Sequence, residues 1–362
     1  MKTDTGNGSI VKVLVGGAAI LIILFGMRMS SAILSPMLLA VIIGISVAPA
    51  VDWLKRKGVP GWLALLITIG LVILGVVGLI ALLGISVSGL LGALPEYRDN
   101  LRGQIEGLRT ALANVGLGDT QLEAFLGQFD AGKILSFFGS ALGGLFGFLS
   151  HLVAMLMVLI FLLLAAPGLT TKLGTGFPED NPTLMRFRGL AQHLREYVSI
   201  TTWINFLVGL VNTVLLILLG VDYAILWGLL SFLMGYIPNV GYIPNVGFWI
   251  ALVPPFLLAL LEFGGVKALI VLAGYIVING GVQNFLQPRM MGSGLNLSPL
   301  VVVLSLFVWG WVLGPMGALL AVPLTMIVKE VLLDAYEGTR GLAELMSADS
   351  PTKQPAPDVR AE

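Results

Sequence analysis

The sequence predicts an all-α integral membrane protein with about eight membrane segments, including two broken, re-entrant helical hairpins that form an inverted repeat. Three observations predict this fold: the composition, the spacing of the charges, and a break that occurs twice in the C-terminal half. Hydrophobic residues make up 57% of the 362 residues and charged residues 11%, against about 25% charged residues in a soluble domain. The mean hydropathy is +0.97. So few charges cannot cover a soluble surface, which excludes a cytosolic enzyme, a disordered chain and a nucleic-acid-binding protein.

Stretches without a charged residue recur along the chain at lengths that cross a bilayer. A helix crosses about 30 Å of hydrocarbon with about 20 residues, whereas barrel strands alternate in segments of about 10 residues. The first stretch is short enough for a signal peptide, but another follows at once without a clear cleavage site, which favours a retained span. The stretches are continuous and therefore predict helices at Val13–Met27, Met29–Val51, Pro60–Pro95, Ile134–Thr171, Tyr197–Val221, Tyr223–Leu261, Ala268–Pro288 and Met290–Val328.

The basic residues predict the orientation of these spans. With the N-terminus inside and one crossing for each stretch, 14 of the 20 Lys and Arg residues lie on the cytoplasmic side and 6 on the other. Cytoplasmic loops carry the excess of basic residues, so we expect both termini in the cytoplasm. The chain has no cysteine and two histidines, so we expect no disulfide, no metal site and no cofactor.

The distribution of charges divides the chain into five parts. Leucines at helical spacing predict an amphipathic helix in the second part, and a polar, proline-rich composition predicts disorder from about residue 347. The parts are three N-terminal spans (1–95), an extracytoplasmic amphipathic segment (96–133), a fourth span with a cytoplasmic helical linker (134–196), a C-terminal core (197–335) with two repeat units (197–261 and 268–328), and a cytoplasmic tail (336–362).

Two uncharged stretches in the core are each 39 residues long, nearly twice the length of one span. Glycine, proline and aromatic residues interrupt them at Tyr236–Gly247 and Gly310–Gly317, and the first break contains the hexapeptide GYIPNV twice in tandem. Each stretch follows a span that carries amide side chains. If both stretches are re-entrant hairpins, the two units are inverted relative to each other, as in transporters with discontinuous helices. A single kinked crossing for each stretch is the alternative.

Broken backbone inside a membrane leaves peptide groups that only protein or water can satisfy, so the breaks predict a polar cavity. Amide side chains near the breaks can bind a solute there, or they can simply hold helices together. The candidate solute-path residues are Asn205, Asn212, Tyr236, Pro238, Asn239, Asn245, Asn279, Gln283, Asn284, Trp309, Gly314 and Pro315. The candidates for ion or proton coupling are His151, Asp222 and Glu262.

The segment QPRMMGSGLNLSPLVVVLSLFVWGWVLGPMGALLAVPLT at residues 287–325 resembles the C-terminal signature of the autoinducer-2 exporter family. YIPNVG, the LVPP that follows it and LPEYRDNL after the third span fit the same family, which has a single YIPN-type element where this chain has two. The resemblance implies a bacterial inner-membrane transporter that forms a homo-oligomer, with a pentamer as the candidate assembly. It implies export of the quorum-sensing signal autoinducer-2 or exchange of sodium or lithium for protons.

The ionisable residues help to choose between these functions. A sodium/proton antiporter usually needs a carboxylate inside the membrane, and Asp222 and Glu262 lie only at the ends of stretches. A lone histidine such as His151 is more often structural than a proton relay. A passive channel is a further alternative, and the sequence carries no motif of a membrane enzyme. We therefore predict a carrier in the lipid bilayer that exports a small, neutral polar solute such as autoinducer-2.

Overall fold

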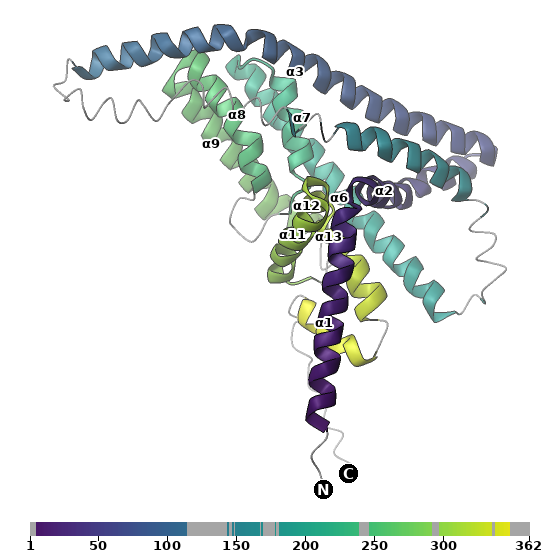
Figure 1. Ribbon diagram of the computed structural model, residues 1–362. Helices are drawn as coiled ribbons and strands as arrows, with labels where there is room; N and C mark the ends of the chain where they lie inside the picture. The colour runs from purple at the N-terminus through teal and green to yellow at the C-terminus, as the bar shows by residue number, and fades with distance from the viewer. Residues whose placement is uncertain are drawn as a thin grey trace, which may run out of the picture.

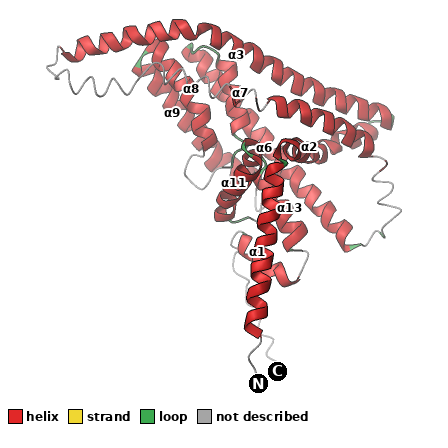
Figure 2. Ribbon diagram, in the orientation of Figure 1, coloured by secondary structure: helices red, strands yellow, loops and turns green. Residues whose placement is uncertain are grey.

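A computed structural model describes residues 5–113, 143–144, 147, 149–166, 168, 178, 181–238, 246–291, 297–334 and 337–347. All regular elements in these ranges are helices (Figure 2), which confirms the predicted all-α membrane fold. Asn239, Asn245, the second GYIPNV copy up to residue 245, residues 114–133 of the extracytoplasmic segment and the tail beyond residue 347 lie outside the described residues.

Five helices in the described ranges are long and apolar enough to cross a membrane. They are α2 (Ser31–Arg56), the Gly61–Ala93 part of α3, the helix Leu149–Ala166, α6 (Pro182–Leu219) and α8 (Val246–Phe263). The other elements are α1 (Thr5–Met29), α7 (Ala224–Met234), α9 (Gly265–Gly281), η1 (Val282–Leu286), α10 (Gln287–Met291), α11 (Pro299–Leu313), α12 (Pro315–Leu319), α13 (Ala321–Ile327), η2 (Val328–Leu333), η3 (Glu337–Thr339) and α14 (Arg340–Met346).

Helix α3 continues far beyond its apolar part. It runs from Gly61 to Ala113, which is 53 residues or about 80 Å, along one edge of the molecule (Figure 1). The charged residues after Pro95 therefore extend the third span as the same helix. In contrast, α1 meets the rest of the molecule near its C-terminal end, where the rings of Phe25 and Trp311 lie 5.1 Å apart and the Arg28 guanidinium lies 4.4 Å from the Trp311 ring.

Prolines inside α2 leave backbone groups that other helices satisfy. Pro49 has no N–H, so the carbonyl of Ile45, four residues earlier, lacks its helical donor. Arg195 of α6 supplies the missing donor, because its Nε lies 2.8 Å from the Ile45 oxygen. Pro49 removes a hydrogen bond from α2, and at the same point Arg195 binds α6 to α2.

Local sequence explains where the core helices begin and end. The side chain of Asn181 accepts a hydrogen bond from the Thr183 N–H at 2.9 Å, and Pro182 occupies the first turn of α6, where its missing N–H costs nothing. The helix ends at Gly220, whose φ of 76° is readily adopted only by glycine. Ser298 caps α11 in the same way as Asn181 caps α6.

The C-terminal core is built from helices that approach each other closely at glycines. Gly209 of α6 and Gly228 of α7 are in contact: a Cβ on either residue would lie 2.7 Å from the carbonyl oxygen of the other. In the second hairpin a Cβ at Gly317 would clash with the Trp309 carbonyl. Small residues allow such contacts between helix backbones in lipid, and here they pack α7 on α6 and α12 on α11.

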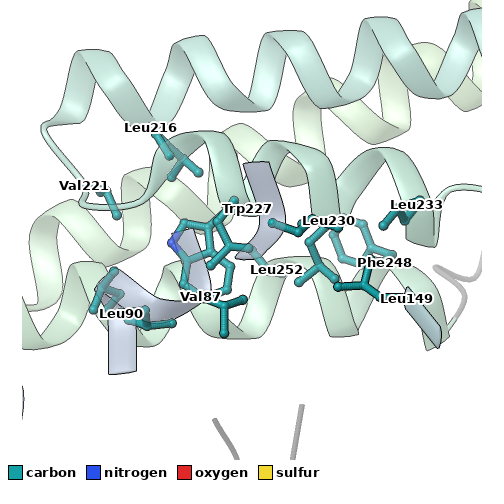
Figure 3. Packing of buried hydrophobic residues seen from close by; sticks show 14 of the residues in the cluster. Val87, Leu90, Leu149, Leu216, Val221, Trp227, Leu230, Leu233, Phe248 and Leu252 are labelled. Carbon is teal, nitrogen blue, oxygen red and sulfur yellow. The ribbon is translucent and has the colours of Figure 1, made fainter. Parts of the chain in front are cut away.

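The largest buried cluster in the described residues joins helices α6–α9 to the N-terminal spans. Trp227 of α7 is 2% exposed and lies among Val87 and Leu90 of α3, Leu216 of α6 and Leu252 of α8 (Figure 3). Outside this core, large apolar side chains face outward: Leu218 is 79% exposed, Val277 70% and Leu74 69%. Such a surface needs lipid rather than water around it, and it fits a core held against α2 and α3 within the bilayer.

Candidate functional site

A cavity of about 130 Å³ lies beside the first break, where α6 to α9 meet α11 and α13. The uncharged part of α6 starts at Tyr197, and the cavity-lining residues of α6 run from Tyr197 to Val208, or about 16 Å along the helix, so the cavity reaches from one edge of the hydrocarbon to about its middle. We call it the polar cavity. Its described lining residues are Tyr197, Thr201, Ile204, Asn205, Val208, Ser231, Gly235, Tyr236, Pro238, Gly247, Phe248, Ala251, Asn279, Val282, Gln287, Val302 and Val322.

Asn205 presents a hydrogen-bond donor to this cavity. Its side chain is buried, and its Nδ2 has no hydrogen-bond partner among the described residues. Gly235 at the end of α7 makes room for it, because a Cβ there would lie 2.4 Å from the Asn205 Oδ1. Leaving a buried amide without a partner costs about 1–3 kcal/mol, so this donor is suited to a bound solute or water.

Asn279 of α9 lines the same cavity. Its Nδ2 donates to the carbonyl of Tyr275 at 2.8 Å, which leaves the amide oxygen as the group that can accept a hydrogen bond. Asn205 and Asn279 are 74 residues apart in the sequence, yet they supply a donor and an acceptor to one cavity. A small molecule with both kinds of group can bind between them.

Tyr236 closes one side of the polar cavity. Its hydroxyl lies 2.7 Å from the Oγ1 of Thr202, which in turn lies 2.6 Å from the Val198 carbonyl and donates to it. The Phe232 ring packs edge-on against the Tyr236 ring at 5.7 Å. The tyrosine is therefore fixed to α6, just ahead of Pro238, which also lines the cavity.

Among the other solute-path candidates on described helices, Asn212 does not line the cavity. Asn212 is fully buried on α6, and neither atom of its amide has a hydrogen-bond partner among the described residues. Gln283 and Asn284 have their backbones in η1, the π-helical turn that follows α9. Such turns are frequent at functional sites, and the first residue of η1, Val282, lines the cavity.

The candidates in α11 and in the second break build the hairpin itself. Trp309 is buried, and its Nε1 donates to the Oγ1 of Thr325 at 3.0 Å, joining α11 to α13. Gly314 has a φ of 68° at the tip of the hairpin, and Pro315 begins α12. The second hairpin contributes Val302 and Val322 to the cavity, so in the described residues its role at this site is that of an apolar wall.

The candidate coupling residues lie away from the cavity. Glu262 accepts a hydrogen bond from the backbone N–H of Asp222 at 3.4 Å, near Lys267, whose Nζ donates to the Leu219 carbonyl at 3.1 Å. Along α8, Glu262 is about 22 Å from the cavity residue Gly247. His151 is hydrogen-bonded to the Gly147 carbonyl of its own helix at 2.8 Å.

The described lining residues include no Asp, Glu, Lys, Arg or His. Across the described ranges no group of three or more His, Cys, Asp or Glu side chains is placed to hold a metal ion. The chemistry that this cavity offers is therefore hydrogen bonding by uncharged groups, against apolar walls from α6, α8, α11 and α13.

The structure also places at the cavity residues that the sequence analysis did not single out, namely Tyr197, Thr201 and Ser231. The Thr201 hydroxyl faces that of Tyr197 but makes no hydrogen bond of good geometry with any described residue. Thr201 lies one helical turn before Asn205, on the same face of α6, and this spacing is the signal that could have revealed it.

Comparison with known proteins places this architecture among transporters. Residues 18–337 match the family described as AI-2E family transporter. The AI-2 transport protein TqsA of Escherichia coli K12 is 35% identical over 343 residues, covering 95% of this chain and 97% of TqsA. YhhT of the same strain, named provisionally as a transport protein, is 30% identical and covers 97% of this chain and 98% of its own length. A Haemophilus influenzae protein, also named provisionally as a transport protein, is 35% identical over 94% of this chain and 97% of its own.

Proposed function

This chain belongs to the AI-2E family of transporters, and on that premise we propose that it exports a small, uncharged polar solute through the polar cavity. The family and the apolar helices make it a multi-pass transport protein of the bacterial inner membrane, surrounded by lipid, and not an enzyme. Because TqsA is named as an AI-2 transport protein, autoinducer-2 is the first solute to test.

The observation that carries this proposal is the unpaired amide of Asn205 in an uncharged cavity that reaches about the middle of the membrane. An ion would need a charged or densely coordinating site there, whereas a neutral solute needs only hydrogen bonds. A cavity of about 130 Å³ has room for several water molecules. The site therefore suits a small solute with a few hydroxyl or carbonyl groups.

The lengths of the helices support re-entrant hairpins. Helix α7 has 11 residues, or about 16 Å, and α11 has 15, or about 22 Å. Both are shorter than the hydrocarbon thickness of about 30 Å, so each first arm ends inside the bilayer. We propose that the two units enter the membrane from opposite sides and that their breaks meet at the cavity.

The assembly is also part of the proposal. By its family resemblance the chain forms a homo-oligomer, with a pentamer as the first assembly to test. Helix α1 exposes apolar residues along most of its length, including Leu14 at 66%, Ile22 at 72% and Ile23 at 61%. In an oligomer this face can pack against lipid or against a neighbouring subunit.

The test is solute efflux from proteoliposomes loaded with autoinducer-2 and, separately, with sodium or lithium. We expect saturable efflux of the neutral solute. The Asn205→Leu variant should lose at least about fivefold in initial rate, since one net hydrogen bond contributes about 1 kcal/mol. Thr68→Val is the matched control, because Thr68 is buried on α3 and its hydroxyl bonds only its own helix, at the Ala64 carbonyl. Unchanged efflux in Asn205→Leu, or exchange of cations without solute efflux, would contradict the proposal.

A further inference from the structure

A second cavity lies on the other side of Tyr236. It has a volume of about 750 Å³ and lies between the N-terminal spans and the transport core. Its described lining is mostly apolar and includes no Asp, Glu, Lys, Arg or His side chain. We call it the apolar hollow. Its walls come from α2, α3, the helix Leu149–Ala166, α6, α7 and the α12–α13 region.

The apolar hollow and the polar cavity share a wall. Tyr197 and Tyr236 line both. On α6 the neighbouring threonines divide between them, because Thr201 lines the polar cavity and Thr202 lines the hollow. The hydrogen bond of 2.7 Å between Thr202 and Tyr236 thus lies at the boundary. Rotation of the Tyr236 side chain would break this one hydrogen bond and join the two spaces.

The rim of the hollow faces lipid. Trp203 and Phe206 line it on α6, and they are 63% and 51% exposed. They lie in the uncharged part of a helix that spans the membrane, at the same level as Thr201 and Asn205. A molecule dissolved in the bilayer can therefore reach the hollow without passing through water.

We infer that the apolar hollow is a lateral portal, through which an uncharged amphiphile places its polar head in the polar cavity and its apolar tail in the hollow, with Tyr236 as the gate. This inference rests on the proposed function and extends its substrate class. The polar cavity alone has room for only a small head group, whereas the hollow is more than five times larger. The two spaces together match a molecule with a small hydrogen-bonding head and an alkyl or aromatic tail.

The absence of cysteine from the chain makes a chemical test direct. Ala251 is a small, buried residue that lines the polar cavity on α8, so the Ala251→Cys variant places one thiol there. N-dodecylmaleimide is the probe, because it has a small uncharged head and a long alkyl tail. We expect it to label this thiol in proteoliposomes, and we expect Tyr236→Phe to raise the labelling rate several-fold by removing the hydroxyl from the gate.

A bulky side chain at position 75 is expected to close the portal. Gly75 lines the hollow on α3, and a Cβ there meets nothing within 4 Å, so Gly75→Trp can fill the space without a clash. We expect it to slow labelling of the Ala251→Cys variant at least tenfold. Gly70→Trp is the matched control, because Gly70 is exposed on the same helix, also has nothing within 4 Å, and does not line the hollow. Ser46→Leu blocks the hollow from α2 and replaces Gly75→Trp if that variant does not fold.

Three results would overturn the portal. The first is equal labelling in the blocked variants and the Gly70→Trp control. The second is no labelling of the Ala251→Cys variant by the long reagent. The third is labelling of a Ser199→Cys variant, whose thiol lies in the hollow, without labelling at Ala251→Cys, which would mean that the hollow holds only lipid chains. Efflux that continues in Gly75→Trp with unchanged labelling would remove the portal and leave the proposed function. Labelling that Gly75→Trp blocks, together with no solute efflux from the protein without this substitution, would remove the proposed function and leave the portal.

Discussion

At the scale of single residues, the site depends on glycines that make space for polar side chains. Gly235 is the clearest case, because it ends α7 directly against the amide of Asn205. Its own φ of −63° suits any residue, so backbone conformation does not require a glycine here. The requirement is the space that the amide occupies.

Gly235→Ala should displace the Asn205 amide from the polar cavity and slow efflux. The added Cβ would lie 2.4 Å from the Asn205 Oδ1, so the amide must rotate and the donor must leave its position in the cavity. We expect about a tenfold loss in the initial rate of solute efflux. Gly84→Ala is the control, because a Cβ at Gly84 meets nothing within 4 Å. Equal efflux in both variants would show that the position of the amide does not matter.

Single residues also show which features of the cavity the sequence pattern could not predict. Helical spacing places Asn205 and Asn212 on one face of α6, yet only Asn205 lines the polar cavity. Trp309 lies within α11, one residue before the expected break at Gly310–Gly317, and it is buried and bonds Thr325 between the two arms. A sequence pattern identifies the face of a helix, whereas the helix that packs against that face depends on the rotation and tilt of the whole bundle. Ser231 was missed for the same reason, whereas the spacing of Thr201 to Asn205 could have revealed Thr201.

At the scale of elements, backbone groups lost in one helix are recovered from another. The carbonyl of Ile45 has no helical donor because of Pro49, and Arg195 donates to it from α6 at 2.8 Å. This contact ties an N-terminal span to the helix that carries Asn205. Prolines within membrane helices are tolerated because neighbours satisfy the freed groups.

A double-mutant cycle tests this contact. Arg195→Leu should lower the free energy of unfolding by about 1–3 kcal/mol, since a carbonyl within the bundle loses its donor. In a Pro49→Ala background the helix supplies its own N–H, so the same Arg195→Leu change should cost less than half as much. Denaturation in mixed detergent micelles measures both values. An identical cost in the two backgrounds would show that Arg195 stabilises the fold in some other way.

The broken helices were predictable because glycine and proline have strong local effects. Gly314 and Pro315 mark the tip of the second hairpin in the sequence, and the structure places a positive φ and a new helix there. Long uncharged stretches likewise predicted the membrane helices, because the hydrocarbon thickness sets their length. The continuation of α3 through charged residues to Ala113 was not evident, because a change in polarity does not by itself end a helix.

At the scale of the whole molecule, the N-terminal spans and the C-terminal core have separate roles. The core forms the polar cavity, and α2, α3 and the helix Leu149–Ala166 form one side of the apolar hollow. The largest buried cluster holds the two parts together around Trp227. This division puts the polar cavity within the core and the apolar hollow between the core and the N-terminal spans.

Orientation in the membrane can be tested on intact cells with single cysteines. Excess basic residues predict that Ser30 faces outward and Lys57 faces the cytoplasm. Both flank α2. A membrane-impermeant maleimide should label Ser30→Cys and leave Lys57→Cys unlabelled until the cells are opened. The opposite pattern would invert the proposed topology and with it the direction of export.

The central claim is that the solute binds in the polar cavity beside Asn205. The most direct measurement is the rate at which N-ethylmaleimide alkylates the Ala251→Cys variant as the concentration of a transported solute rises, with Ser30→Cys as the control, because Ser30 is exposed and lines neither cavity. We expect at least tenfold slower alkylation at Ala251→Cys once transport is saturated, and little change at Ser30→Cys. Saturated transport with an unchanged rate at Ala251→Cys would contradict this claim, because the solute would then cross the membrane by another path.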